Sequence, residues 1–197
     1  MKILGLCGGS GSGKGATCSV FTEFGIKCID TDKVYRDIIS TDSECSKELV
    51  EVFGNQIAAE KGINKAKLRE FVFSSKESLK LLNSITHKHI LANVRSQIND
   101  IKKRTDIKGV VVDAPLLFES GFDKECDATL CIIADDKIRL NRIIMRDGIS
   151  SELARTRIAS QITNSELMTR CTYSIENNGT YADLREKVIS FKKTFFD

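Results

Sequence analysis

At 197 residues the chain can bury one substantial hydrophobic core, but it is too short for two full domains. Its hydrophobic content of 41% and charged content of 29% are ordinary for a globular protein. The net charge of +3, without a dense basic tract, argues against a nucleic-acid partner, and no apolar stretch approaches the about 20 residues of a membrane span.

Apolar runs that predict strands alternate with helical segments, which is typical of an α/β fold with a parallel sheet. We expect strands at residues 2–7, 27–30, 109–113, 128–134 and 173–177. We expect helices at residues 14–24, 33–39, 43–53, 65–73, 76–103, 135–146, 151–161, 164–170 and 181–195. The helical stretch between the second and third strands is longer than a crossover needs, so we interpret it as an inserted layer that covers a substrate.

A glycine-rich loop follows the first strand, in the stretch Gly8-Gly-Ser-Gly-Ser-Gly13-Lys14. Glycines let successive backbone N–H groups converge on an anionic oxygen, and a lysine in the first helical turn can reach the β- and γ-phosphates of a nucleotide. The pattern is incomplete, because the next position should be Ser or Thr to meet Mg²⁺ and is Gly15 instead. A glycine-rich turn without a ligand is the alternative, but we favour nucleotide binding.

Acidic residues end the second and third strands, at the sheet edge where open α/β folds bind ligands. Asp32 could orient a substrate hydroxyl and accept its proton, or it could equally be the N-cap of the helix that follows. Asp113 closes the apolar run of the third strand and could hold Mg²⁺ directly or through water; a turn-forming aspartate is the alternative.

Arg139, Arg142 and Arg146 share one face of a predicted helix, and Arg155 and Arg157 follow in the next one. A row of guanidinium groups suits a polyphosphate whose charge must be offset during transfer. Solvated surface arginines are the alternative, which we favour for Arg139 and Arg155.

Three smaller features complete the sequence. The two histidines, His87 and His89, are too few for most metal sites, and we expect His89 to be structural or exposed. Asn177-Asn178-Gly179 predicts a turn after the last strand, and its backbone could also line an adenine pocket. Seven scattered cysteines without a C-x-x-C pair favour reduced thiols and a cytoplasmic location over disulfides or zinc.

Taken together, these residues resemble the dephospho-coenzyme A kinase family over essentially the whole chain. The glycine-rich loop alone is unspecific, but the ordered set of matching segments is much more specific. The matching segments are residues 5–14, 25–32, 68–73, His87, 113–119, Arg142, 146–150, 157–161 and 176–179.

The resemblance implies a P-loop kinase three-layer fold with a mainly parallel five-stranded sheet, a helical substrate-binding insert and a helical lid. One kinase domain would span residues 1–197, with its core at about 1–40, 105–145 and 171–197. The helical substrate region would cover about 41–104, and the lid about 146–170.

The resemblance also implies ATP-dependent phosphorylation of the ribose 3′-hydroxyl of dephospho-CoA, the last step of CoA synthesis, with Mg²⁺ as cofactor. The implied catalytic residues are Asp32, Lys14, Arg142 and Arg146, and the implied metal residue is Asp113. The implied ATP-binding residues are Gly9, Gly11, Ser12, Gly13, Lys14, Gly15, Ala16, Asn177, Asn178 and Gly179. The implied substrate-binding residues are Asp32, Arg69, His87, Leu117 and Arg157. The partners would be these two small molecules, without nucleic acid or membrane, for a monomer or weak homo-oligomer.

Two departures from the family pattern stand out. Lys14-Gly15-Ala16 replaces the usual Lys-Ser-Thr, which removes the expected Mg²⁺-facing hydroxyl, and Glu176 replaces the usual aspartate. A nucleoside kinase is the second enzymatic interpretation, because similar loops occur in uridine-kinase-like proteins. A degenerate nucleotide- or CoA-binding module is the third.

Overall fold

The computed structural model describes residues 1–73 and 75–197, and the chain divides into two compact units. The first unit contains Met1–Ile29 and Lys102–Asp197, and the second contains Asp30–Ile101. The expected division into core, substrate region and lid stays a prediction.

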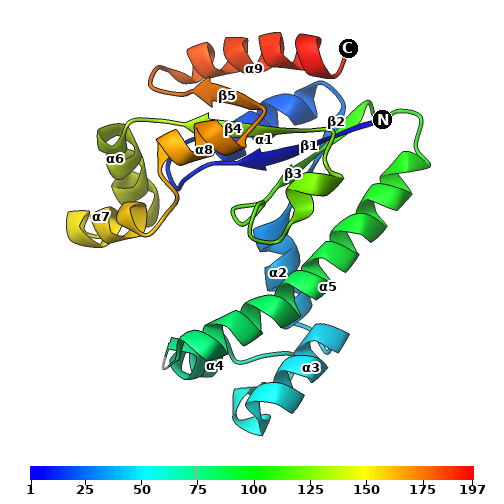
Figure 1. Ribbon diagram of the computed structural model, residues 1–197, viewed down its shortest axis with the longest axis vertical. Helices are drawn as coiled ribbons and strands as arrows, with labels where there is room; N and C mark the ends of the chain where they lie inside the picture. Colours follow the sequence, from blue (N-terminus) through cyan, green and yellow to red (C-terminus); the bar gives the residue numbers. More distant parts are fainter. Residues whose placement is uncertain (74) are drawn as a thin grey trace. The chain divides into compact units, whose positions relative to one another are not determined.

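A five-stranded sheet with strand order β2-β3-β1-β4-β5 organises the first unit (Figure 1). β1 pairs in parallel with both β3 and β4, and β4 pairs in parallel with β5. The α/β class and the five-stranded sheet are therefore confirmed. The strands are β1 (Lys2–Cys7), β2 (Ile26–Asp30), β3 (Gly109–Asp113), β4 (Ala128–Ile133) and β5 (Tyr173–Glu176).

The main core of the first unit lies between this sheet and two helices, α1 (Lys14–Glu23) and α9 (Tyr181–Phe195). Leu4 and Leu6 of β1 and Phe21 of α1 are fully buried in it. The three valines of β3 are buried, as expected of a strand that is covered on both faces. The other helices of this unit are η2 (Phe122–Glu125), α6 (Asp136–Asp147), α7 (Ser151–Ala159) and α8 (Asn164–Arg170).

The second unit is helical and has its own hydrophobic core, in which Leu49 and Ile57 are fully buried. It contains α2 (Thr31–Ile39), α3 (Glu44–Phe53), η1 (Asn55–Ile57), α4 (Lys65–Phe73) and most of α5 (Lys76–Lys102).

The ends of the predicted elements agree with the structure to within two residues. The helix expected from residue 33 begins at Thr31, because the carboxylate of Asp30 accepts a hydrogen bond from the Lys33 amide at 2.9 Å and caps it. The alternative role of Asp32 as this N-cap is therefore wrong. Among the described residues, no helix combines the length and apolar character needed to cross a membrane.

Candidate functional site

The glycine-rich loop joins β1 to the N-terminus of α1. Gly11 and Gly13 have φ angles of 76° and 109°, which other residues rarely adopt. A Cβ atom on Gly13 would also lie 2.2 Å from Nδ2 of Asn177, so a side chain has no room there. The loop therefore places backbone N–H groups around the first turn of α1, an arrangement suited to an anionic oxygen.

Lys14 and Asp113 meet at the carboxyl ends of β1 and β3. Lys14 Nζ donates a hydrogen bond to the Gly8 carbonyl at 3.1 Å and lies 3.9 Å from Asp113 Oδ1. Both side chains are mostly buried, with 15% and 17% of their surface exposed. The ammonium group thus lies inside the loop that would receive a phosphate, with a carboxylate beside it.

The space beside Gly15 could accommodate the hydroxyl group that this position lacks. A Cβ on Gly15 would have no neighbour within 4 Å among the described residues, and Gly15 does not have the positive φ of Gly11 and Gly13. Thr17 does not replace the hydroxyl, because it is fully buried and its Oγ1 donates to the Gly13 carbonyl at 3.2 Å.

Arg139 is buried beneath the loop, with only 2% of its surface exposed. Its Nε donates to the Ser10 carbonyl at 3.0 Å, and its guanidinium also pairs with Asp136 at 3.0 Å. The interpretation of Arg139 as a solvated surface residue is therefore wrong. A planar group with five donors can hold several acceptors at once, which suits it to this buried position.

Gln161, which follows α7, completes the same cluster. Its Oε1 accepts from the Ser10 amide at 3.0 Å and from Arg139 at 2.7 Å, while its Nε2 donates to Ser10 Oγ at 3.1 Å. We call Arg139, Gln161 and Ser10 the loop clamp. Sequence reasoning did not assign a role to Gln161, although it ends one of the segments that resemble the family.

Arg142 and Asn177 fasten the other side of the loop. Arg142 donates to the carbonyls of Gly11 and Asn177, at 3.3 and 3.0 Å. The buried Asn177 side chain donates to the Ser12 carbonyl at 2.7 Å. These bonds bring the turn after β5 against the loop, as nucleotide binding by both segments would need.

Arg146 lies apart from the other two arginines of its helix face, in a surface ion-pair group. Its guanidinium makes a two-point contact with Asp147, at 2.7 and 3.0 Å, and Arg157 binds the same carboxylate. The hydrogen bonds from Arg146 and then Arg157 lower the pKa of Asp147 to about 2. Both arginines keep much of their surface exposed, so they remain accessible to a ligand.

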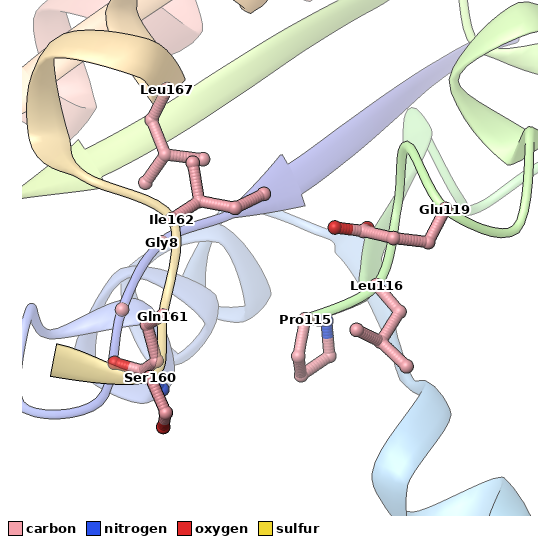
Figure 2. A pocket seen from close by; sticks show the side chains of 9 residues that line it. Gly8, Pro115, Leu116, Glu119, Ser160, Gln161, Ile162 and Leu167 are labelled. Atoms are coloured by element: carbon pink, nitrogen blue, oxygen red, sulfur yellow. The ribbon is translucent and has the colours of Figure 1, made fainter. Parts of the chain in front are cut away.

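A pocket of about 160 Å³ opens beside the loop (Figure 2). Ser160 and Gln161 lie on one side of it, while Pro115, Leu116 and Glu119 lie on the other. The remaining lining residues are Gly8, Gly9, Ile162 and Leu167.

Leu117, the predicted substrate contact in this region, has no exposed surface. A Cβ on Gly5 would lie 2.9 Å from Leu117 Cδ2, which places the leucine in the core against β1. In this conformation its side chain cannot touch a substrate, whereas its exposed neighbour Leu116 lines the pocket.

The remaining predicted residues belong to the helical unit and are described within it. Asp32 is exposed in the first turn of α2, Arg69 is exposed on α4, and His87 is half-buried on α5. His89 lies 2.6 Å from Glu48, consistent with its expected structural role. The catalytic and substrate-binding roles of Asp32, Arg69 and His87 stay predictions.

A family model described as dephospho-CoA kinase matches residues 2–183. A protein from Fusobacterium nucleatum named dephospho-CoA kinase is 42% identical over 195 residues, which cover 98% of each chain.

Solved structures agree with this match. A dephospho-CoA kinase from Campylobacter jejuni superposes with a TM-score of 0.72 and 28% identity, covering 98% of this chain and 96% of the other. Shikimate kinase from Acinetobacter baumannii superposes with a TM-score of 0.56 over 98% of this chain and 94% of the other. At 16% identity, the second likeness concerns the fold alone.

Proposed function

This chain belongs to the dephospho-CoA kinase family, and we propose that it transfers the γ-phosphoryl group of ATP to the ribose 3′-hydroxyl of dephospho-CoA. It is a kinase of CoA biosynthesis, and the products of the proposed step are CoA and ADP. The observation that carries the proposal is the loop itself, in which Lys14 lies between the Gly8 carbonyl and Asp113 at the carboxyl edge of the sheet.

Phosphoryl transfer needs positioning and charge stabilisation more than covalent chemistry from the protein. We propose that Lys14 and the loop amides hold the β- and γ-phosphates, and that Asn177 to Gly179 lie near the adenine. Arg142 and Arg146 would offset charge that develops on the transferring group.

We propose the residues that contact the phosphoryl acceptor on the basis of the family resemblance. Asp32 would orient the attacking hydroxyl and take its proton, which its place as an exposed residue beyond the end of β2 supports. Arg69 and His87 would bind phosphates of the acceptor, and Arg157 would also contact the substrate.

The residues present are compatible with Mg²⁺ as the cofactor. Magnesium in kinases is usually held by one or two carboxylates together with phosphate oxygens and several waters, and Asp113 supplies a carboxylate beside Lys14. When bound, the ion would neutralise charge on the β- and γ-phosphate oxygens. Asp113 would hold it directly or through water, while Gly15 contributes no hydroxyl.

Production of ADP from ATP, measured with a coupled assay, tests the proposal directly. We expect turnover with dephospho-CoA and little with nucleosides. Preferential turnover of a nucleoside would favour a nucleoside kinase, and nucleotide binding without turnover of either acceptor would favour a degenerate binding module. The expected monomer or weak homo-oligomer and the cytoplasmic location also stay predictions.

A further inference from the structure

Three cysteines meet at the base of the glycine-rich loop, outside the residues assigned to the reaction. Cys7 ends β1 directly before Gly8, and Cys131 lies opposite it on β4. Cys171 precedes β5, and its Sγ lies 3.3 Å from that of Cys7. Among the described residues, no group of three or more His, Cys, Asp or Glu side chains is arranged to hold a metal ion.

The three thiols differ in exposure and in protonation. Cys7 and Cys131 are buried, whereas Cys171 is partly exposed. Hydrogen bonds from the thiols of Cys131 and Cys7 lower the pKa of Cys171, and the bond with Cys171 raises the pKa of Cys7. Cys171 is thus the residue of the three with some exposed surface, its lowered pKa favours the thiolate form, and its sulfur is in contact with that of Cys7. Such a pairing is typical of oxidation-sensitive cysteines that have a resolving partner.

We propose that Cys171 is a peroxide-reactive residue that forms a reversible disulfide with Cys7 and thereby disturbs the nucleotide site. The Cys171 thiolate attacks one oxygen of a hydroperoxide, the O–O bond breaks, and hydroxide leaves (an alkoxide, for an organic hydroperoxide). Cys171 is now a sulfenic acid. The Cys7 sulfur then attacks Cys171 Sγ, the S–O bond breaks, and water leaves with the Cys7 proton. The two thiols supply the two electrons that the peroxide accepts.

Neighbouring bonds hold the backbone on both sides of Cys171. The Thr172 amide donates to Thr129 Oγ1 at 2.9 Å, and the Thr129 amide donates to Thr172 Oγ1 at 3.2 Å. The Cys171 amide donates to the Leu167 carbonyl at 2.9 Å, which ties it to the end of α8. Because a disulfide is about 2.0 Å long, the sulfurs need to approach by only about 1 Å.

That small approach acts on the loop, because Gly8 follows Cys7 directly. The Gly8 carbonyl accepts the Lys14 ammonium at 3.1 Å. A Cβ on Gly8 would lie 2.4 Å from the Ile132 carbonyl, so the loop base is packed closely against β4. A shift of about 1 Å in a positioning group can cost about a hundredfold in catalysis, and we expect nucleotide affinity to fall at least about tenfold.

The test compares reduced protein with protein treated with hydrogen peroxide and then alkylated. We expect mass spectrometry to find a peptide that links Cys7 to Cys171, and titration with ADP to show the weaker binding. A dithiol reductant should restore both. Because ADP binding is read without the acceptor, the result does not depend on which acceptor the enzyme phosphorylates.

Variants separate this pair from the other cysteines. Cys171→Ser and Cys171→Ala should keep their ADP affinity after peroxide. Cys126→Ser should respond like the wild type, because burial raises the pKa of Cys126 to about 12 and its thiol donates to the Phe122 carbonyl. Cys28→Ser should also respond like the wild type, since Cys28 contacts Cys18 and not this cluster.

Four results would overturn the proposal. They are a link from Cys171 to Cys131 instead of Cys7, the absence of any link, unchanged ADP binding in the linked protein, and loss of binding in both Cys171 variants after peroxide.

Discussion

A single carboxylate, Asp32, has the most demanding proposed role. Asp32→Asn keeps the size of the side chain but removes the charge that would draw a proton from the attacking hydroxyl. We expect turnover to fall by about 10²–10⁴-fold, the usual contribution of a general base, while ATP affinity stays nearly unchanged. Steady-state kinetics and ATP titration of the purified variant measure the two effects.

Asp30→Asn is the matched control for this substitution. Asn caps helices about as well as Asp, so the bond to the Lys33 amide and the start of α2 should survive. Equal losses of turnover in both variants would mean that the segment matters for its fold rather than for the Asp32 charge.

Gly15 occupies the position at which a complete phosphate-binding loop has serine or threonine. Gly15→Ser adds the hydroxyl that a complete loop uses as a Mg²⁺ ligand, and the open space around this position accommodates it. If water fills the vacant position in the wild type, the serine variant should need less Mg²⁺ for half-maximal rate. Titrating activity against Mg²⁺ measures this.

Gly15→Ala separates the effect of the added hydroxyl from the effect of replacing glycine in the first turn of the helix. It adds a Cβ and helix propensity of up to about 1 kcal/mol, but no metal ligand. We therefore expect a slightly more stable protein with the Mg²⁺ dependence of the wild type. If the serine variant needed as much Mg²⁺ as the wild type or more for half-maximal rate, the site would be built around glycine.

At the scale of elements, the loop clamp connects α6 and the segment after α7 to the glycine-rich loop. Gln161→Ala would remove three hydrogen bonds and leave the buried Arg139 guanidinium with fewer acceptors. Bonds to charged groups contribute about 1.5–3 kcal/mol each, so we expect ATP affinity to fall at least about tenfold. Calorimetric titration of ATP provides the measurement.

Ser160→Ala serves as the comparison, because Ser160 lines the same pocket but its hydroxyl donates to the Arg157 carbonyl at 3.0 Å. It should bind ATP like the wild type. If Ser160→Ala weakened binding as much as Gln161→Ala, the effect would belong to the whole segment and not to the clamp.

The ion-pair group at the end of α6 should make stability depend on pH in the acid range. Because the pKa of Asp147 is lowered to about 2 from 3.8, the folded protein favours the charged carboxylate. This stabilisation is fully present above about pH 4 and is lost as the pH falls through about 2. Asp147→Asn should therefore flatten the acid-side decrease in unfolding free energy. Parallel stability curves for the two proteins between pH 5 and about 2 would contradict this assignment.

At the scale of the whole molecule, the order of elements could be predicted because its signals are local. The valines of β3 and the glycines after β1 each carry their own structural preference. The position of Arg139 could not be predicted, because its partners Ser10 and Gln161 are distant in sequence and only the folded chain brings them together. The burial of Leu117 could not be predicted either, because its side chain packs where Gly5 has no side chain of its own, and Gly5 is distant in sequence.

Each unit has its own hydrophobic core, so we expect a destabilising substitution in one core to loosen mainly the unit that contains it. Leu49 of α3 is fully buried in the helical unit, and Leu184 of α9 is 2% exposed in the sheet unit. Replacing either by alanine should cost about 2–5 kcal/mol. In hydrogen–deuterium exchange, Leu49→Ala should raise exchange in α3 and α4 while β1, β3 and β4 keep their protection. Leu184→Ala should do the reverse. A uniform rise in both units with either variant would show that the chain unfolds as one cooperative body despite its separate cores.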